Sequence, residues 1–262
     1  MDSIVKELCS SPTLLKELYG DLAKPGVIKV GKAIESLLGL GNTILWPITL
    51  LNEKSSLALK TNLDRYREEL GELEESEISG VAPEIGVPIL ERLAYVSNED
   101  LVSMYSELLV KSSCINLSNY AHPSFVNILN NITPDEAVLL RYISNKKDVP
   151  FLIARLRGRG FDNEIYPLLT DTREFNNIRY PENISSYYYN LESLGIVSIL
   201  RDNISSNPEI YEEMESFYSE IFDGIEYDDS IETPSFGCGR IDVTSFGKLF
   251  LEACVHKKRP NK

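Results

Sequence analysis

The chain has 262 residues, 43% of them hydrophobic, and a formal net charge of −14. This composition excludes an intrinsically disordered chain, and the length is enough for one large hydrophobic core or two smaller ones. The acidic balance argues against a general nucleic-acid-binding protein, because phosphate contacts need clustered lysine and arginine. We therefore expect no specific binding to DNA.

The cysteines and the N-terminus indicate the cellular compartment. The four cysteines are scattered, at Cys9, Cys114, Cys238 and Cys254. They form no CxxC pair, and the two histidines complete no zinc-binding spacing, so the sequence predicts no metal site and no cofactor. Free thiols fit a reducing cytoplasm, and the first residues lack the basic and apolar regions of a signal peptide. We expect a cytoplasmic protein.

The first predicted module, residues 1–56, contains short helices and an uncharged apolar segment. This segment, residues 36–52, carries no charge over seventeen positions. As a helix it would span about 25 Å, short of the roughly 30 Å hydrocarbon core of a bilayer. Gly39, Gly41 and Pro47 also interrupt it. The pattern favours a buried helical hairpin, and a membrane-seeking hairpin is the alternative.

The membrane alternative specifies its own contact residues. Trp46 would lie at the membrane interface, and an anionic lipid surface would attract Lys24, Lys29 and Lys32. The apolar side chains that would enter the membrane are Leu37, Leu38, Leu40, Ile44, Leu45, Trp46, Leu50 and Leu51. On this hypothesis the cytoplasmic protein associates with a membrane.

Residues 57–145 are predicted to form a helical module. Asn98 can cap an amphipathic helix that continues to about Lys111. Two further helical segments meet at Thr133, which can cap the second one, with Glu136 in the position that a capping box requires. His122 precedes a proline at a helix start, and we interpret it as a capping or packing residue.

Residues 146–256 are predicted to form a small α+β module. A helix over 184–194 ends at Gly195 and leads into a short strand, IVSIL. A return strand over 240–243 and a helix capped by Thr244 follow. The order helix, strand, strand, helix predicts a winged-helix-like unit.

Three details of this module limit its function. The helix over 184–194 has no lysine or arginine, which favours protein contacts over DNA recognition. Arg155, Arg157 and Arg159 are predicted to lie in a solvated loop or to pair with carboxylates. The sequence Gly-Cys-Gly around Cys238 predicts a tight turn, and residues 257–262 are predicted to form a disordered tail.

The predicted fold class is therefore mainly α, with a helical N-terminal module followed by the small winged-helix-like module. No Walker sequence, nucleophile elbow, paired-histidine motif or dinucleotide fingerprint is present. We predict no catalytic residues and expect a protein that is not an enzyme.

Several short motifs resemble one family. The sequence HPSF at 122–125 is followed by TPDEA at 133–137, with YSELLVKSS at 105–113 before them. The tyrosine-rich YYYNLESLGIV at 187–197 and VTSFGKLFLEAC at 243–254 follow. Together they resemble the Abi-alpha family of bacterial abortive-infection proteins.

The resemblance implies a role in bacterial defence against phage, in which the infected cell dies or stops growing. We expect a non-enzymatic effector that acts at the membrane through residues 36–52. The alternative is a cytoplasmic adaptor or regulator that binds a phage or host protein through the winged-helix-like module. A homo-oligomer is compatible with either hypothesis.

Overall fold

The computed structural model describes residues 25–38, 53–158, 161–175, 177–223 and 235–257. Two compact units are formed, and each is described by itself. Unit 1 comprises residues up to Pro134 together with residues from Leu249 onward, and unit 2 comprises Asp135–Lys248. The predicted boundaries of the three modules and the tail stay predictions.

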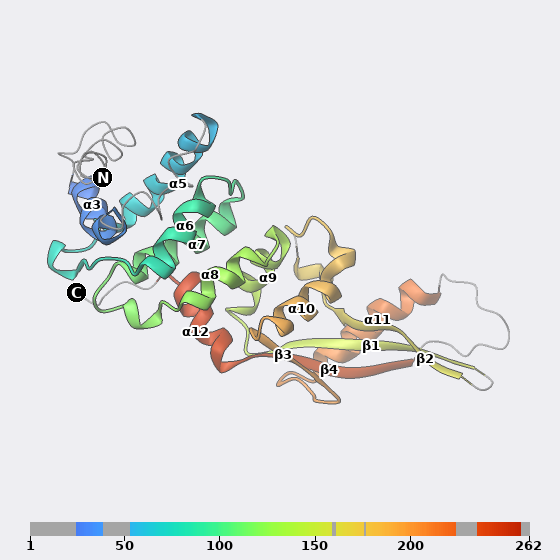
Figure 1. The fold of residues 1–262 in the computed structure, drawn as a ribbon. Helices are drawn as coiled ribbons and strands as arrows, with labels where there is room; N and C mark the ends of the chain where they lie inside the picture. Colours follow the sequence, from blue (N-terminus) through green and yellow to red (C-terminus); the bar gives the residue numbers. More distant parts are fainter. Residues whose placement is uncertain (1–24, 39–52, 159–160, 176, 224–234, 258–262) are drawn as a thin grey trace. The chain divides into compact units, whose positions relative to one another are not determined.

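Unit 1 is helical in its described residues (Figure 1). Its longer helices are α3 (Pro25–Leu38), α5 (Glu53–Gly71), α6 (Pro83–Leu93), α7 (Glu99–Ser112), α8 (Pro123–Asn130) and the second part of α12 (Ser245–Cys254). Short 3₁₀ turns are η1 (Glu75–Glu77) and η2 (Ser118–Tyr120).

Helix α7 is the centre of unit 1, and α5, α6 and α8 pack against it. Every residue from Leu101 to Ser112 is buried, so the helix is enclosed on all sides and not amphipathic in the usual sense. The side chain of Asn98 accepts a hydrogen bond from the Leu101 N–H at 3.1 Å, which confirms the predicted cap.

Unit 2 combines helices with a four-stranded antiparallel sheet. The strands are β1 (Val149–Gly158), β2 (Phe161–Thr170), β3 (Val197–Arg201) and β4 (Ser235–Val243), in the order β2-β1-β4-β3. The helices are α9 (Pro134–Ile143), α10 (Ile184–Ser193), α11 (Glu209–Asp223) and the start of α12, with 3₁₀ turns η3 (Thr172–Glu174) and η4 (Pro181–Asn183).

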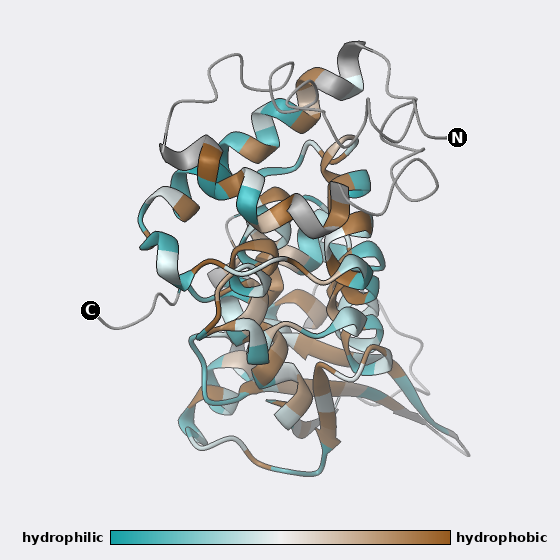
Figure 2. Ribbon diagram, turned by 60° about the vertical axis from the view of Figure 1, so that its left-hand side comes forward, coloured by the Kyte–Doolittle hydropathy of each residue, from teal (hydrophilic) through white to brown (hydrophobic). Residues whose placement is uncertain are grey.

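Helix α11 packs along β1 and supplies much of the core of unit 2. The strands carry long hydrophobic stretches, drawn brown in Figure 2. The buried side chains shared by α11 and β1 are Leu152, Ala154, Tyr211, Met214, Tyr218 and Phe222. Burial of this cluster removes apolar surface from water and stabilises the helix on the sheet.

The predicted fold class is wrong in its account of the sheet. Two long strands, β1 and β2, precede residue 190, whereas both predicted strands, IVSIL and 240–243, follow it. Strand β4 pairs with β3, as the predicted return strand should, but it also pairs with β1. The C-terminal part is therefore built on a four-stranded sheet and is not a winged-helix-like unit.

Two sequence patterns concealed the sheet. Arg155 and Arg157 lie within β1, opposite Glu164 and Asp162 of β2, where we predicted a loop as one option. Gly-Cys-Gly lies inside β4 and is not a tight turn. A Cβ on Gly239 would lie 2.2 Å from the ring of Phe151 on β1, so a glycine is needed at this pair.

The end of α10 follows its sequence prediction. Gly195 has a φ of 76°, in the left-handed region. Its N–H donates to the Glu192 carbonyl at 2.9 Å, and the Ile196 N–H donates to the Leu191 carbonyl at 2.9 Å. This pair of hydrogen bonds is the Schellman arrangement that ends a helix at a glycine.

Candidate functional site

The motif HPSF begins helix α8. The Nδ1 atom of His122 accepts a hydrogen bond from the Ser124 N–H at 3.1 Å, so His122 is the N-cap of the helix. Phe125 lies edge-on to Phe250, with ring centroids 5.4 Å apart. These contacts confirm the structural role predicted for His122.

The two acidic residues of TPDEA are buried. Asp135 is 5% exposed and Glu136 is 1% exposed. The Asp135 carboxylate accepts hydrogen bonds from the N–H groups of Arg179 and Tyr180 and from the Tyr187 hydroxyl, at 2.9, 3.0 and 2.9 Å. Glu136 accepts one from the Asn190 amide at 2.6 Å. The motif thus joins α9 to α10, a role we had not predicted. The cap at Thr133 stays a prediction.

The predicted membrane-contact residues divide into two sets. Lys24, Leu40, Ile44, Leu45, Trp46, Leu50 and Leu51 lie outside the described residues, and of Leu38 only the backbone is described. Leu37 is fully buried in unit 1. Its side chain packs against Gly86 of α6. A Cβ atom at Gly86 would lie only 2.5 Å from the Cδ1 atom of Leu37. Leu37 is therefore a core residue in this conformation.

Lys29 and Lys32 bind the backbone of unit 1. The Lys29 ammonium donates to the Gly71 carbonyl at 2.9 Å and also to the Leu73 carbonyl. The Lys32 ammonium donates to the Glu75 carbonyl at 2.7 Å. Gly71 is the last residue of α5, where carbonyl groups lack partners within the helix and a cation is favourable. The two lysines hold α3 against this helix end.

A buried lysine likewise binds backbone carbonyl groups at the C-terminal end of α12. Lys111 is fully buried, and its ammonium donates to the carbonyl groups of Glu252 and His256, with the Glu107 carboxylate 3.8 Å away. Cys254, also buried, has a pKa raised by desolvation. A thiol in that environment stays protonated, which fits a packing role. The sequence alone did not indicate this cluster.

Among residues 25–38, 53–158, 161–175, 177–223 and 235–257, no three histidine, cysteine or acidic residues group closely enough to hold a metal ion. Nor does any helix within these ranges combine the length and the apolar character that crossing a bilayer requires.

Unit 2 contains a cavity of about 270 Å³ at one end of its sheet. It is formed by segments far apart in sequence: the end of α9, the start of β1, the end of β2 and the loop before α11. The lining residues are Tyr142, Lys146, Lys147, Asp148, Val149, Pro150, Asp171, Ser205, Ser206, Asn207 and Ile210. None of them had been predicted as a site residue.

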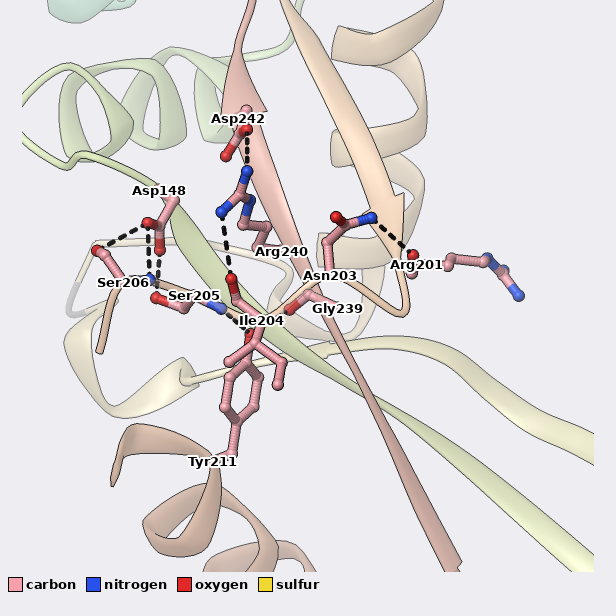
Figure 3. A network of polar contacts seen from close by, with 10 residues as sticks. All are labelled: Asp148, Arg201, Asn203, Ile204, Ser205, Ser206, Tyr211, Gly239, Arg240 and Asp242. Atoms are coloured by element: carbon pink, nitrogen blue, oxygen red, sulfur yellow. Dashed lines mark hydrogen bonds and ion pairs between the residues drawn. The ribbon is translucent and has the colours of Figure 1, made fainter. Parts of the chain in front are cut away.

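A polar network fixes one wall of this cavity (Figure 3). The Asp148 carboxylate accepts hydrogen bonds from the hydroxyl of Ser205, and from the N–H at 3.2 Å and the hydroxyl at 2.9 Å of Ser206. The Ser205 N–H donates to the Tyr211 hydroxyl at 2.9 Å, which donates in turn to the Gly239 carbonyl at 2.7 Å. The loop is thereby tied to both α11 and β4.

These contacts set the charge of Asp148. Burial raises its pKa, but the donated hydrogen bonds from Ser205 and Ser206 outweigh burial, and the pKa lies below its usual value. Asp148 is consequently ionised at neutral pH. Arg240 adds a positive charge nearby, bound to Asp242 at 3.2 Å and to the Ile204 carbonyl at 3.2 Å.

The family model described as abortive infection alpha matches residues 58–254. No curated protein and no solved structure matches the chain. The matched range contains the HPSF, TPDEA and YSELLVKSS motifs, together with all four strands of the sheet.

Proposed function

The chain belongs to the abortive infection alpha family, and from this premise we propose that it is a non-enzymatic effector of phage defence that acts on a membrane. In the proposed mechanism, α3 leaves its contacts in unit 1 upon infection and binds the membrane surface together with the uncharged segment 36–52. The observation that carries the proposal is the attachment of α3 through Lys29 and Lys32, two cations that an anionic membrane also attracts.

The contributions of the two lysines are of similar size in the two states. A hydrogen bond to a charged group contributes about 1.5–3 kcal/mol in a folded protein. A lysine near an anionic lipid surface gains about 1 kcal/mol. Insertion of apolar side chains from segment 36–52 would add to the membrane side at about 0.8 kcal/mol for each methylene group. A difference of a few kcal/mol is one that a ligand or partner can reverse.

The buried side chain of Leu37 also holds α3 in unit 1. It fills space next to Gly86, and the backbone of α3 is held nearby by a hydrogen bond from the Val81 N–H to the Ala33 carbonyl at 2.8 Å. Release of α3 would expose Leu37 and free both ammonium groups from their carbonyl partners. Such a surface combines apolar and basic side chains, as membrane-binding segments do.

The adaptor hypothesis depended on the winged-helix-like module. A four-stranded sheet takes its place, so we do not propose an adaptor of that kind.

Gly86→Ala tests the release of α3. The added Cβ would meet Leu37 Cδ1 at 2.5 Å and Val81 Cγ1 at 2.9 Å, which should loosen α3 without changing any residue proposed to touch lipid. We expect the purified full-length variant to sediment with phosphatidylglycerol-containing liposomes more than the wild type does. Gly237→Ala, in β4 of unit 2, is the control, because the nearest atom to its new Cβ is 3.8 Å away.

A measurement in infected cells makes the result decisive. In infected cells, the wild-type protein should move to the membrane fraction as the membrane potential falls. The proposal is wrong if protection persists while the protein stays in the supernatant and the membrane potential is intact.

A further inference from the structure

The geometry points to a ligand site in unit 2: its cavity binds an uncharged ring compound with neighbouring hydroxyl groups, a monosaccharide or the ribose of a nucleoside. The recognising groups are two carboxylates, an amide and a serine hydroxyl. This inference rests on unit 2 alone, and it would stand if the proposed membrane action were wrong.

The charged groups that line the cavity cancel. They are two lysines and two carboxylates: Lys146, Lys147, Asp148 and Asp171. The charged side chains next to the lining also form opposite pairs, Arg173 with Glu213 at 3.9 Å and Arg240 with Asp242 at 3.2 Å. A cavity without net charge offers no general attraction to an anion or to a cation, and this favours an uncharged ligand.

The two carboxylates of the lining each have room for one more donor. A carboxylate offers about four lone-pair positions. Asp148 uses three for the donors of Ser205 and Ser206. Asp171 uses three for Arg173, whose N–H, Nε and Nη2 donate at 3.1, 2.8 and 2.7 Å. A ligand hydroxyl fills the remaining position without bringing a charge, and a hydrogen bond from a hydroxyl to a carboxylate is short and strong.

Both carboxylates are ionised and therefore act only as acceptors. The hydrogen bonds from Arg173 hold the pKa of Asp171 below its usual value, and the positive charge of Lys146 adds to this effect. The pKa of Asp148 is lowered as described above. The Lys146 ammonium also lies 4.8 Å from the centre of the Tyr142 ring. This lysine is thus already engaged within the protein, and the site needs a ligand that donates.

The loop before α11 supplies groups that complement a hydroxyl in both directions. The exposed Ser206 hydroxyl donates to Asp148, and its oxygen retains lone pairs that accept. The side chain of Asn207 lines the cavity and makes no hydrogen bond within the part of the chain that the structure describes. Its amide offers both donors and an acceptor. Because the Asp148 network holds this loop (Figure 3), little ordering is needed on binding.

Cavity size and the remaining lining fit a small ring. A volume of about 270 Å³ lies just below the usual range of small-molecule pockets, about 300–1,000 Å³, so the ligand is no larger than a nucleoside. Val149, Pro150 and Ile210 give the cavity an apolar part. The C–H face of a sugar ring, or a nucleobase, packs on such a surface while the hydroxyl groups reach the carboxylates.

The test is a thermal-shift and calorimetric titration of the full-length protein with ribose, adenosine, 2′,3′-dideoxyadenosine and AMP. A ligand that binds the folded state raises the melting temperature once its concentration exceeds Kd. We expect a rise with ribose or adenosine. Ribose binding as tightly as adenosine indicates a monosaccharide, and adenosine binding at least about 10-fold more tightly indicates a nucleoside.

The other two probes test the proposed chemistry. Loss of a hydroxyl that donates to a carboxylate should weaken the Kd of 2′,3′-dideoxyadenosine by about 10- to 100-fold relative to adenosine. AMP should bind no more tightly than adenosine, because the cavity has no net positive charge for the phosphate. Tighter binding of AMP, or equal binding of adenosine and its dideoxy analogue, would show that the hydroxyl groups are not what is recognised.

Asn207→Ala tests the site from the side of the protein. The residue is exposed, so the variant should fold, and loss of one uncharged hydrogen bond should weaken Kd by about 2- to 10-fold. Asn163→Ala, at an exposed position of β2 outside the cavity, is the control and should bind as the wild type does. The inference is overturned if neither ribose nor adenosine raises the melting temperature at about 10 mM, a concentration that fills a millimolar site. It is also overturned if Asn207→Ala leaves Kd unchanged.

Discussion

In the helical unit lysines bind backbone carbonyl groups at helix ends, whereas in the sheet unit carboxylates bind N–H groups of loops. Lys111 binds the carbonyl groups at the end of α12, and Lys29 binds those at the end of α5. Asp135 and Asp148 bind N–H and hydroxyl groups of loops that precede α10 and α11. Both units thus satisfy backbone groups that secondary structure leaves unpaired.

The difference follows from where each unit has unpaired groups. Helices that end inside a helical unit leave carbonyl groups, which need cations or other donors. Long loops around a sheet leave N–H groups, which need acceptors. The comparison teaches that most charged residues in the family motifs are structural. Asp135, Glu136, Glu107 and Lys111 are all buried, and each is bonded to a backbone group or to another side chain of the protein.

The largest effect is expected for Lys111→Met. This change leaves the Glu107 carboxylate, which is 1% exposed, without its buried cation, and the carbonyl groups of α12 without their donor. Removal of one partner of a buried pair costs about 3–5 kcal/mol. Urea unfolding should show that loss, and adding Glu107→Gln should recover part of it. Lys60→Met, at an exposed position of α5, should change stability by less than about 0.5 kcal/mol.

Asp135→Ala tests the corresponding carboxylate of the sheet unit. It leaves the N–H groups of Arg179 and Tyr180 and the Tyr187 hydroxyl without their acceptor. We expect a loss of about 1–3 kcal/mol in unfolding free energy. Asp202→Asn is a suitable control, since Asp202 is exposed with φ of 59°, a conformation that asparagine tolerates. Equal stability of Asp135→Ala and the wild type would contradict the comparison.

The parts of the fold that sequence predicted correctly are those fixed by local contacts. Asn98, His122 and Gly195 each act within three residues of their own position, through a cap or a Schellman turn. Such contacts depend on residue type and spacing alone, so the pattern is visible in the sequence.

The parts that sequence missed depend on contacts between distant segments. Strand β1 is buried on both faces from Phe151 to Ala154, so it lacks the alternation that marks a half-buried strand. The glycines of β4 suggested a turn because nothing nearby in sequence reveals the Phe151 ring. The unit 2 cavity was missed for the same reason: its walls come from residues near 142–150, 171 and 205–210.

Gly239→Ala measures how strongly the sheet depends on one such distant contact. The new Cβ would lie 2.2 Å from the Phe151 ring, which cannot move without disturbing the neighbouring strand. Overpacking of this kind costs about 1–3 kcal/mol. Gly237→Ala, two residues earlier in the same strand, is the matched control, because the nearest atom to its new Cβ is 3.8 Å away. If both variants lose the same stability, the loss reflects strand glycines in general and not this pair.

The smallest effect at neutral pH is expected for Tyr105→Phe, which removes a hydrogen bond from the hydroxyl to the Asn130 side chain at 2.7 Å. The effect grows in alkali. Burial raises the pKa of Tyr105 from 10.0 to about 12, so the folded state disfavours the ionised phenol. The stability that this gives is complete below pH 10, where the unfolded chain is also protonated, and is lost as the pH rises through about 12.

The free energy of unfolding measured between pH 9 and 12 should therefore fall less steeply in Tyr105→Phe than in the wild type. The control is Tyr95→Phe, at a position 65% exposed, which should leave the slope unchanged. Identical slopes in all three proteins would mean that the Tyr105 phenol reaches water readily, and that the helical unit is more open around α7 than the burial of that helix implies.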